Sequence, residues 1–326
     1  MHRKDGLHLT DSGYKDTLID VIDQTSTRLL LEAMNIDHVG DMHDVLEATL
    51  RARKRGAEVL LVYDGYSYPT ALLKHGPHGV VKLRNHLKDL ERAGASLHQV
   101  GGLEANPFAG RHHAKAVVAD NTVFVGGGAN LTHDTFKTKD FMLRFESKAL
   151  ADILFADLPK SARVRIADDT LYAHNGDELL LDSGNKNTSL IYDRTCELAD
   201  KAEKVWFVSK LAPDGRLFEI LDSKDTKYWY NTLASASFFD SVAISIDQNR
   251  QNLDNLYKGS QEIHAKFCVF ELSDGTYEVI TGSHNFNSRG VKFGTQEIAL
   301  HSKDQLLAKE LLDFAYSLND VKNAAS

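Results

Sequence analysis

The fold is decided by residues 263–270, which read Ile-His-Ala-Lys-Phe-Cys-Val-Phe. The apolar and aromatic neighbours predict a strand, and strand side chains alternate between two faces. His264 and Lys266, two positions apart, therefore point to the same side. A second predicted strand, 276–280, leads into the turn Gly282-Ser283-His284-Asn285. The segment thus directs an imidazole and an ammonium group toward one place, with a carboxamide in the turn behind them.

The same arrangement occurs earlier in the chain, where His113-Ala114-Lys115 is followed by Gly127-Gly128-Ala129-Asn130. The histidines are 151 positions apart (264 − 113) and the asparagines 155 (285 − 130). A polar turn at 273–276 accounts for the four additional residues of the second copy. This regular repetition predicts a duplicated unit.

Length and composition narrow the class of protein. The 326 residues suit two domains of about 150 residues each. The net charge of −8 argues against a non-specific nucleic-acid binder, which needs a positive field. The cysteines, Cys196 and Cys268, lack the spacing of a metal site or a disulfide framework. No apolar run approaches 18 residues, so we expect no transmembrane helix. The basic N-terminus is not followed by an apolar segment, so we expect no signal peptide. These features predict a cytoplasmic protein that could still contact a membrane peripherally.

Helical and strand patterns alternate along the chain, which predicts an α/β fold. The predicted helices are 11–23, 42–55, 80–93, 148–157, 189–201, 216–222 and 303–316. The predicted strands are 28–34, 58–63, 96–100, 113–118, 122–125, 140–145, 204–210, 241–246, 263–270, 276–280 and 295–301. We expect two similar lobes related by a pseudo-two-fold axis, each a mixed, mostly parallel sheet flanked by helices. The first lobe would span 1–165 and the second 166–326. A hairpin of residues 164–166 and 178–181 around Asn175-Gly176 would mark the junction.

The duplicated residues suggest phosphate chemistry. Two imidazoles, two ammonium groups and two carboxamides around one small volume suit an anion with several oxygens, above all a phosphate ester. One neutral histidine can attack phosphorus while the other, protonated, gives its proton to the leaving oxygen. Lys115 and Lys266 supply the positive charge, so we expect no metal ion and no cofactor. The other histidines, among them His75, His78 and His86, show no partner pattern and are expected to be solvated.

Each catalytic histidine needs a partner, usually a carboxylate, on its second ring nitrogen. Asp140 and Glu297 are the candidates, since each opens an otherwise apolar strand after an asparagine-containing turn. An acidic residue in such a strand is costly unless it is paired. A surface ion pair is the competing interpretation for both residues.

At this point the sequence resembles the phospholipase D superfamily, whose pattern is His-x-Lys-x4-Asp followed by Gly-Ser-x-Asn. The matching residues are His113, Lys115, Asp120, Gly127 and Asn130 in the first copy, and His264, Lys266, Gly282, Ser283 and Asn285 in the second. The resemblance covers nearly the whole chain. It implies a two-lobed α/β fold and metal-independent phosphodiester cleavage or transfer through a phosphohistidine. It also implies that His113 is the nucleophile and His264 the general acid, a choice that the nearly symmetric sequence leaves open.

Two positions depart from the pattern. Gly128 replaces the first serine, so its contact with the phosphate would come from the backbone. Glu271 stands in the place of the second aspartate, five positions after Lys266, and is expected to be structural like Asp120. A Gly-Gly-x-Asn turn followed by a Gly-Ser-x-Asn turn resembles the cardiolipin synthase-like branch.

We therefore expect an enzyme that acts on phospholipid phosphodiesters, with phosphatidyl transfer ranked ahead of hydrolysis. Both half-sites lie in one chain, so a monomer suffices. Asn130, Asn285 and Ser283 would hold the phosphate, although all three also suit plain turns. The aromatic clusters 66–68 and 228–230 would either line the site mouth or fill the core. The alternatives are a nuclease or DNA-repair phosphodiesterase of the same superfamily and a non-catalytic protein that binds phosphorylated ligands.

Overall fold

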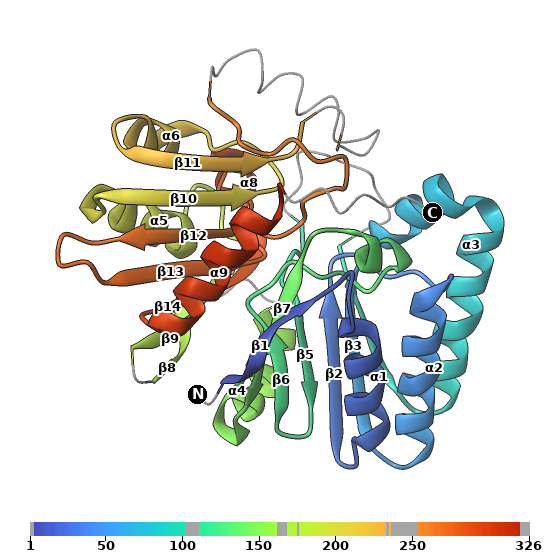
Figure 1. Ribbon diagram of the computed structural model, residues 1–326. Helices are drawn as coiled ribbons and strands as arrows, with labels where there is room; N and C mark the ends of the chain where they lie inside the picture. Colours follow the sequence, from blue (N-terminus) through green and yellow to red (C-terminus); the bar gives the residue numbers. More distant parts are fainter. Residues whose placement is uncertain are drawn as a thin grey trace.

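The computed structural model describes residues 3–101, 111–161, 168–174, 176–232, 235 and 253–319. Two seven-stranded sheets, each flanked by helices, form two lobes (Figure 1). The first sheet has the strand order β1-β7-β6-β5-β2-β3-β4 and the second the order β11-β10-β12-β13-β14-β9-β8. The predicted α/β fold with two lobes is confirmed.

The first lobe contains the elements β1 (Arg3–Leu9), α1 (Tyr14–Gln24), β2 (Arg28–Ala33), α2 (Asp41–Lys54), β3 (Glu58–Asp64), α3 (Ser67–Arg92), β4 (Ser96–Val100), β5 (Ala116–Ala119), β6 (Thr122–Val125), the 3-10 helix η1 (His133–Lys137), β7 (Phe141–Glu146) and α4 (Lys148–Ser161). The second contains β8 (Asp169–His174), β9 (Asp177–Ser183), α5 (Leu190–Lys201), β10 (Lys204–Ser209), α6 (Gly215–Asp222), β11 (Asp225–Tyr230), β12 (Phe267–Glu271), β13 (Tyr277–Gly282), α8 (Ser288–Phe293), β14 (Gln296–Ser302) and α9 (Gln305–Ser317).

The duplication predicted from the motifs extends to the strand order. When the second sheet is read in the reverse direction, its strands β9-β14-β13-β12-β10-β11 correspond in order to β1-β7-β6-β5-β2-β3 of the first sheet. The correspondence aligns β5 with β12, the two strands that directly follow the His-x-Lys segments. The repeated sequence motif is therefore part of a repeated fold.

The expectation of mostly parallel sheets is wrong. Among the described strands, parallel pairing joins β2 to β3, β3 to β4, and β10 to β11, whereas the other neighbours pair antiparallel. Short connections explain the difference. Only residues 120–121 separate β5 from β6, and 272–276 separate β12 from β13. A parallel connection needs about a dozen residues or more.

Other element boundaries also differ from the prediction. Strands β5 and β12 begin only after Lys115 and Lys266, so both His-x-Lys segments precede their strands. The strands β1, β8 and β11 were not predicted, and α3 begins at Ser67 and kinks at Gly76. The hairpin at the start of the second lobe pairs β8 with β9. The expected strands 164–166 and 241–246 and the lobe boundary at 165/166 lie outside the described residues.

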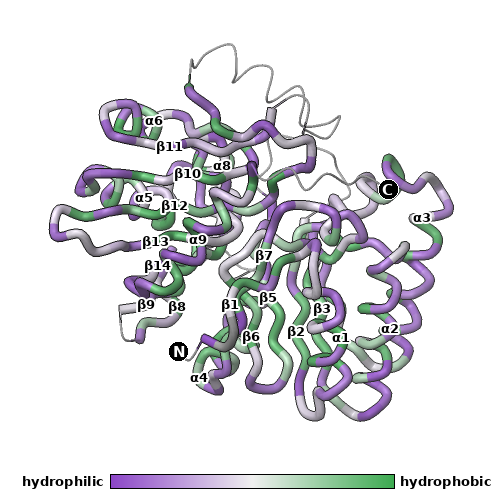
Figure 2. The backbone as a smooth tube through the Cα atoms, in the orientation of Figure 1, coloured by the Kyte–Doolittle hydropathy of each residue, from purple (hydrophilic) through white to green (hydrophobic). Residues whose placement is uncertain are grey.

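Hydrophobic residues run along strands such as β5 and β6 (Figure 2). Among the described residues, three clusters of buried hydrophobic side chains hold the lobes. One packs α1 to α3 on the first sheet, and another packs α5 and α6 on the second. The third contains residues of both sheets together with α4 and α9. In it, the rings of Phe141 and Phe267 both contact Phe314, with centroids 5.3 and 6.0 Å from it. This shared core fixes the two sheets relative to each other. Within the described residues, none of the helices combines the length and apolarity needed to cross a bilayer.

The motif aspartate of the first lobe, Asp120, lies away from the His-x-Lys segments. It adopts a left-handed backbone conformation with φ of 53°. Its carboxylate accepts hydrogen bonds from the backbone N–H groups of Ser26, Thr27 and Arg28, at 2.9, 2.8 and 3.1 Å. These bonds fix the turn that starts β2. Glu271, at the end of β12, forms no such cap with its side chain within the described part of the chain.

Replacing Asp120 should therefore reduce stability. We expect Asp120→Ala to lower the free energy of unfolding by about 2 kcal/mol, because three backbone donors lose a charged acceptor. The matched variant Glu271→Ala should change it by less than about 0.5 kcal/mol. Urea unfolding followed by circular dichroism measures both. Equal losses for the two variants would contradict the structural role of Asp120.

Candidate active site

The two His-x-Lys segments meet between the lobes through a pair of crossed backbone bridges. The N–H of His113 donates to the carbonyl oxygen of Gln296 at 2.9 Å, and that of His264 donates to the carbonyl oxygen of Lys139, also at 2.9 Å. Return bonds run from Gln296 N to Arg111 O at 2.8 Å and from Lys139 N to Glu262 O at 2.8 Å. The backbone of His113 is therefore bonded to the second lobe next to Glu297, and the backbone of His264 is bonded to the first lobe next to Asp140.

The carboxylates pair with the histidines in the same crossed manner. His113 Nδ1 lies 2.9 Å from both oxygens of Glu297. His264 Nδ1 lies 2.8 Å from Asp140 Oδ2. Asp140 and Glu297 are almost fully buried, at 1% and 3% exposure. The sequence identified both carboxylates without indicating that each would serve the histidine of the opposite lobe.

Lys115 and Lys266 are buried beside the histidines. Lys115 Nζ donates to the carbonyl oxygen of His113 at 2.7 Å, and Lys266 Nζ donates to that of His264. Burial lowers the pKa of Lys115 to about 7, with Glu297 opposing the shift, and lowers that of Lys266 to about 8, with Asp140 opposing it. Such ammonium groups gain from a nearby anion, because burial disfavours an isolated charge.

Burial also lowers the pKa values of the two histidines. It lowers the pKa of His113 to about 4, an effect that Glu297 opposes and Lys115 strengthens. It lowers the pKa of His264 well below the ordinary value, and the charges of Lys266 and Lys210 act in the same direction. Both imidazoles are therefore neutral at neutral pH in this state, and each has its Nδ1 directed to a carboxylate. A neutral ring with Nδ1–H donated to a carboxylate leaves Nε2 with a free lone pair.

The two carboxylates are not equivalent. Burial tends to raise the pKa of Glu297, but the charge and hydrogen bond of His113 overcome it and hold that pKa at about 2. Burial raises the pKa of Asp140, and Lys266 and the backbone donors offset it only in part. Glu297 is thus the more firmly ionised of the pair. This difference distinguishes the two half-sites, although their motifs are nearly the same.

Ser283 and Gly128 occupy corresponding places behind these carboxylates. Ser283 Oγ donates to Glu297 Oε2 and accepts from Ile298 N at 3.0 Å, so its hydroxyl is used to hold the carboxylate. In the other half, the backbone N–H of Gly128 donates to Asp140 Oδ1 at 3.2 Å. A Cβ at Gly128 would lie 2.6 Å from the carbonyl oxygen of His264 and 2.7 Å from Asp140 Oδ2. The structure therefore places both residues against carboxylates.

The two asparagines line a cavity of about 290 Å³ together with His113 and His264. Asn130 Oδ1 accepts from the backbone N–H of Asn35 at 3.3 Å. Asn285 Oδ1 is buried and has no hydrogen-bond partner among the described residues. An amide held in this way beside two imidazoles is available to a ligand in the cavity.

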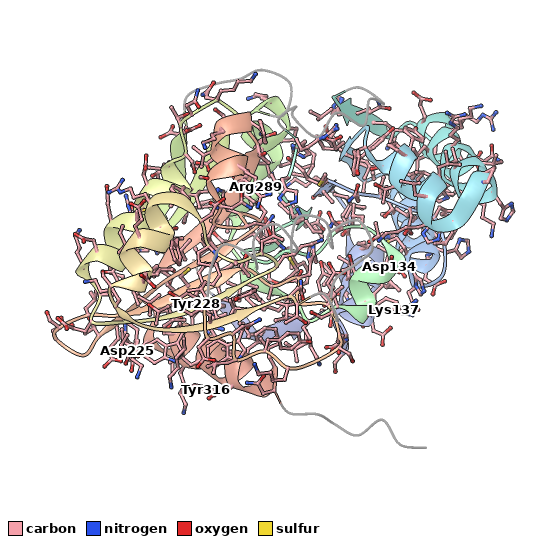
Figure 3. The ribbon with its side chains drawn as sticks, turned by 90° about the horizontal axis from the view of Figure 1, so that it is seen from above. Asp134, Lys137, Asp225, Tyr228, Arg289 and Tyr316 are labelled. Carbon is pink, nitrogen blue, oxygen red and sulfur yellow. The ribbon has the colours of Figure 1, made fainter. Side chains whose placement is uncertain are left out.

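The mouth of the cavity carries charged pairs and apolar side chains. Lys210 lies 3.0 Å from Glu262, and Lys74 lies 2.7 Å from Asp134. Leu73 of α3 also lines the cavity and is 59% exposed. Figure 3 shows Asp134 on the first lobe and Arg289 on the second. The mouth therefore combines paired charges with an exposed apolar surface.

Several residues at the site were not predicted. Lys210 and Glu262 line the cavity, yet neither belongs to a motif that sequence reasoning could recognise. Of the aromatic clusters, Tyr66 lines the cavity, whereas residues 228–230 lie buried in β11. His112, adjacent to His113, is directed away toward Glu32, 3.1 Å from its Nε2.

The comparisons with known proteins agree with this geometry. The family model described as cardiolipin synthase, phospholipase D-like domain, matches residues 18–158. The comparison with curated proteins gives no match.

Among solved structures, phosphatidylserine synthase from Haemophilus influenzae Rd KW20 is similar, with a TM-score of 0.74 and 13% identity over 98% of this chain and 87% of that one. Yeast tyrosyl-DNA phosphodiesterase has a TM-score of 0.54 and 13% identity over 92% and 89%. Polyphosphate kinase from Porphyromonas gingivalis has a TM-score of 0.61 and 12% identity over 94% and 45%. At these identities the similarity shows the fold. The resemblance predicted from the duplicated motif is thereby confirmed at the level of the two-lobed phospholipase D-like fold, and the matching family model lies within the first lobe.

Proposed function

We propose that this protein cleaves or transfers phosphodiesters through a phosphohistidine, and that its substrates are phospholipids. The observation that supports this most directly is the crossed pairing of His113 with Glu297 and of His264 with Asp140 around one cavity. Two oriented, neutral imidazoles with two buried ammonium groups suit a phosphate that is attacked on one side and released on the other.

In the first step, Nε2 of His113 attacks phosphorus and forms a P–N bond as the P–O bond to the leaving alcohol breaks. The proton for that alcohol comes from His264. In the free state the pKa of His264 is well below its ordinary value, since burial and Lys266 disfavour its charge. A bound phosphate anion beside the ring stabilises the imidazolium and so provides the acid. Lys115 and Lys266 neutralise the charge that develops on the phosphoryl oxygens.

In the second step, neutral His264 takes a proton from water or from an acceptor alcohol. The activated oxygen attacks phosphorus, the P–N bond breaks, and His113 leaves as a neutral imidazole. Water gives hydrolysis, and an alcohol gives phosphatidyl transfer, which we rank ahead. The same groups serve both outcomes.

The assignment of His113 as nucleophile rests on the resemblance to the phospholipase D superfamily, and the inequality of the carboxylates is compatible with it. The phosphohistidine is cationic on its ring while Nδ1 keeps its proton, so it gains most beside a firmly ionised carboxylate. Glu297, whose pKa is held at about 2 against the effect of burial, provides that charge. Asp140, whose pKa burial raises, suits the histidine that exchanges protons with the leaving and entering groups.

The mouth of the cavity favours a lipid over a nucleic acid. Its lysines are paired with acidic residues, Lys210 with Glu262 and Lys74 with Asp134. Nucleic-acid backbones are bound by positive surfaces, and a net charge of −8 provides no such field overall. Leu73, which lines the cavity and is 59% exposed, offers apolar contact at the same edge. The alternative is a nuclease or DNA-repair phosphodiesterase of this superfamily.

Trapping the phosphoenzyme tests the nucleophile. With a nitrophenyl phosphodiester, whose leaving group needs no proton, His264→Ala should still form the covalent intermediate and accumulate it, because deprotonation of water is lost. His113→Ala should form none and lose at least about 10³-fold in kcat. Mass spectrometry of the neutral-quenched protein locates the phosphoryl group. Its discovery on His264 would reverse the assignment.

The pH dependence of kcat/KM follows from the buried site. His113 must be neutral to attack, and its pKa is lowered to about 4 by burial. The acid limb of the profile, set by protonation of His113, should therefore lie near pH 4 and not near pH 6.5. Lys115, with its pKa lowered to about 7, loses its proton as the pH rises, so KM should increase above that value. Steady-state assays on a soluble phosphodiester measure both limbs. An acid limb near 6.5 would contradict the proposal, and the exposed-site variant His78→Asn should leave the profile unchanged.

The lipid preference is tested at the mouth of the cavity. Leu73→Asp should reduce turnover of phospholipid vesicles about tenfold, because an apolar contact with the bilayer is replaced by a charge. Turnover of a short-chain, soluble phosphodiester should not change. The matched variant Leu306→Asp, at a leucine of α9 that is 68% exposed, should retain both activities. A labelled oligonucleotide in the same assay should remain intact, and cleavage of the oligonucleotide alone would refute the lipid hypothesis.

A further inference from the structure

Three histidines and a glutamate converge on the outer side of the first lobe, apart from the candidate active site. His38 follows β2, His43 and Glu47 lie one turn apart on α2, and His86 lies on α3. His86, which the sequence suggested would be solvated, is instead 4% exposed. Its ring stacks on that of His38, with centroids 4.3 Å apart. Burial explains the error, because α3 packs this face against α2.

We propose that His38, His43 and Glu47 form a zinc-binding site. His43 Nδ1 lies 3.0 Å from His38 Nε2, and His38 Nε2 lies 4.0 Å from Glu47 Oε1. All three candidate ligand atoms lie within 4.8 Å of one another. Tetrahedral zinc with bonds near 2.0–2.2 Å places its ligand atoms about 3.3–3.6 Å apart. Small side-chain adjustments therefore bring this set to zinc geometry.

The surroundings supply the other parts of a zinc site. His86 Nδ1 lies 3.4 Å from Glu47 Oε1, where it can orient the carboxylate as an outer partner. A cavity of about 330 Å³ opens beside His38 and His43 and leaves room for water as a fourth ligand. His38 Nδ1 and His86 Nε2 are buried without a hydrogen-bond partner in the described part of the chain. Neither of these atoms is a proposed zinc ligand, so the case for the site rests on the geometry of His38 Nε2, His43 Nδ1 and Glu47 Oε1.

One charged side chain beside the cluster opposes a cation. The ammonium group of Lys82, which also lines this cavity, repels a cation. A site with a neutral histidine pair and one carboxylate should therefore bind zinc with moderate affinity, which removal of Lys82 would increase.

The zinc site would stabilise the segment that supports Asn130. Asp37, adjacent to His38, donates its N–H to Leu131 O at 3.0 Å, and Leu131 donates its own to Asn35 O at 3.0 Å. The Asp37 carboxylate also accepts from the backbone N–H of His133. A metal bound at His38 should thus reduce local opening of residues 35–38 and 130–133 together.

Zinc binding is testable on untagged, chelator-treated protein. Calorimetric titration with zinc should show one site per chain, and the melting temperature should rise with zinc concentration. His43→Ala and Glu47→Gln should each weaken binding at least about tenfold. His43 is exposed, so its replacement leaves the fold intact. Lys82→Met should tighten binding, and His78→Ala, an exposed histidine elsewhere on α3, should not alter it.

Two results would overturn the proposal. One is the absence of zinc binding by the wild-type protein. The other is unchanged zinc affinity in both His43→Ala and Glu47→Gln, which would place an adventitious ion elsewhere. Hydrogen exchange at residues 35–38 and 130–133 provides a readout that is independent of enzymatic activity, since zinc should slow it in the wild type and not in His43→Ala.

Discussion

Each histidine of the candidate site is held by a carboxylate from the other lobe, and the rest of the structure depends on this crossed pairing. Neither lobe alone supplies both a His-x-Lys segment and the partner that orients its imidazole. A buried carboxylate without a partner costs several kcal/mol, so separating the lobes would leave both halves unfavourable. The crossed backbone bridges and the core shared by Phe141, Phe267 and Phe314 enforce the same arrangement. The fold therefore maintains the geometry that the proposed chemistry requires.

Burial sets the electrostatics of this site more than any single contact does. It is the largest influence on the pKa of His113, His264, Lys115 and Lys266, and in each case it disfavours the charged form. The ligand-free site is therefore poorly solvated but rich in groups that become more basic next to an anion. A phosphate supplies that anion, so binding of substrate and charging of the general acid are coupled. Under the proposed function, this coupling links catalytic competence to an occupied site.

The sequence predicted the duplication, the α/β fold and the residues that meet at the site, because these follow from apolar patterns and repeated motifs. It did not predict β1, since Arg3–Leu9 mixes charged and apolar residues as an edge strand can. Nor could it show that Ser283 holds Glu297, because the direction of a hydroxyl depends on packing between strands. The cluster of His38, His43 and His86 escaped notice for a related reason. Its members come from the loop after β2 and from two helices, and only the packing of α2 against α3 brings them together.

The two lobes contribute different residues to the mouth of the site, and this difference influences the orientation in which a substrate binds. Where the phosphate would bind, each half offers a histidine, a lysine and an asparagine. Farther out, the first lobe contributes Leu73 and Lys74 of α3, whereas the second contributes Lys210 and Leu211 after β10. A phosphodiester has two different arms, and the mouth decides which arm extends toward which lobe. Because attack and departure occur on opposite sides of phosphorus, that choice also decides which histidine lies behind the leaving group. Under the proposed function, the unequal carboxylates and the unequal mouth must therefore favour the same orientation for turnover to be efficient.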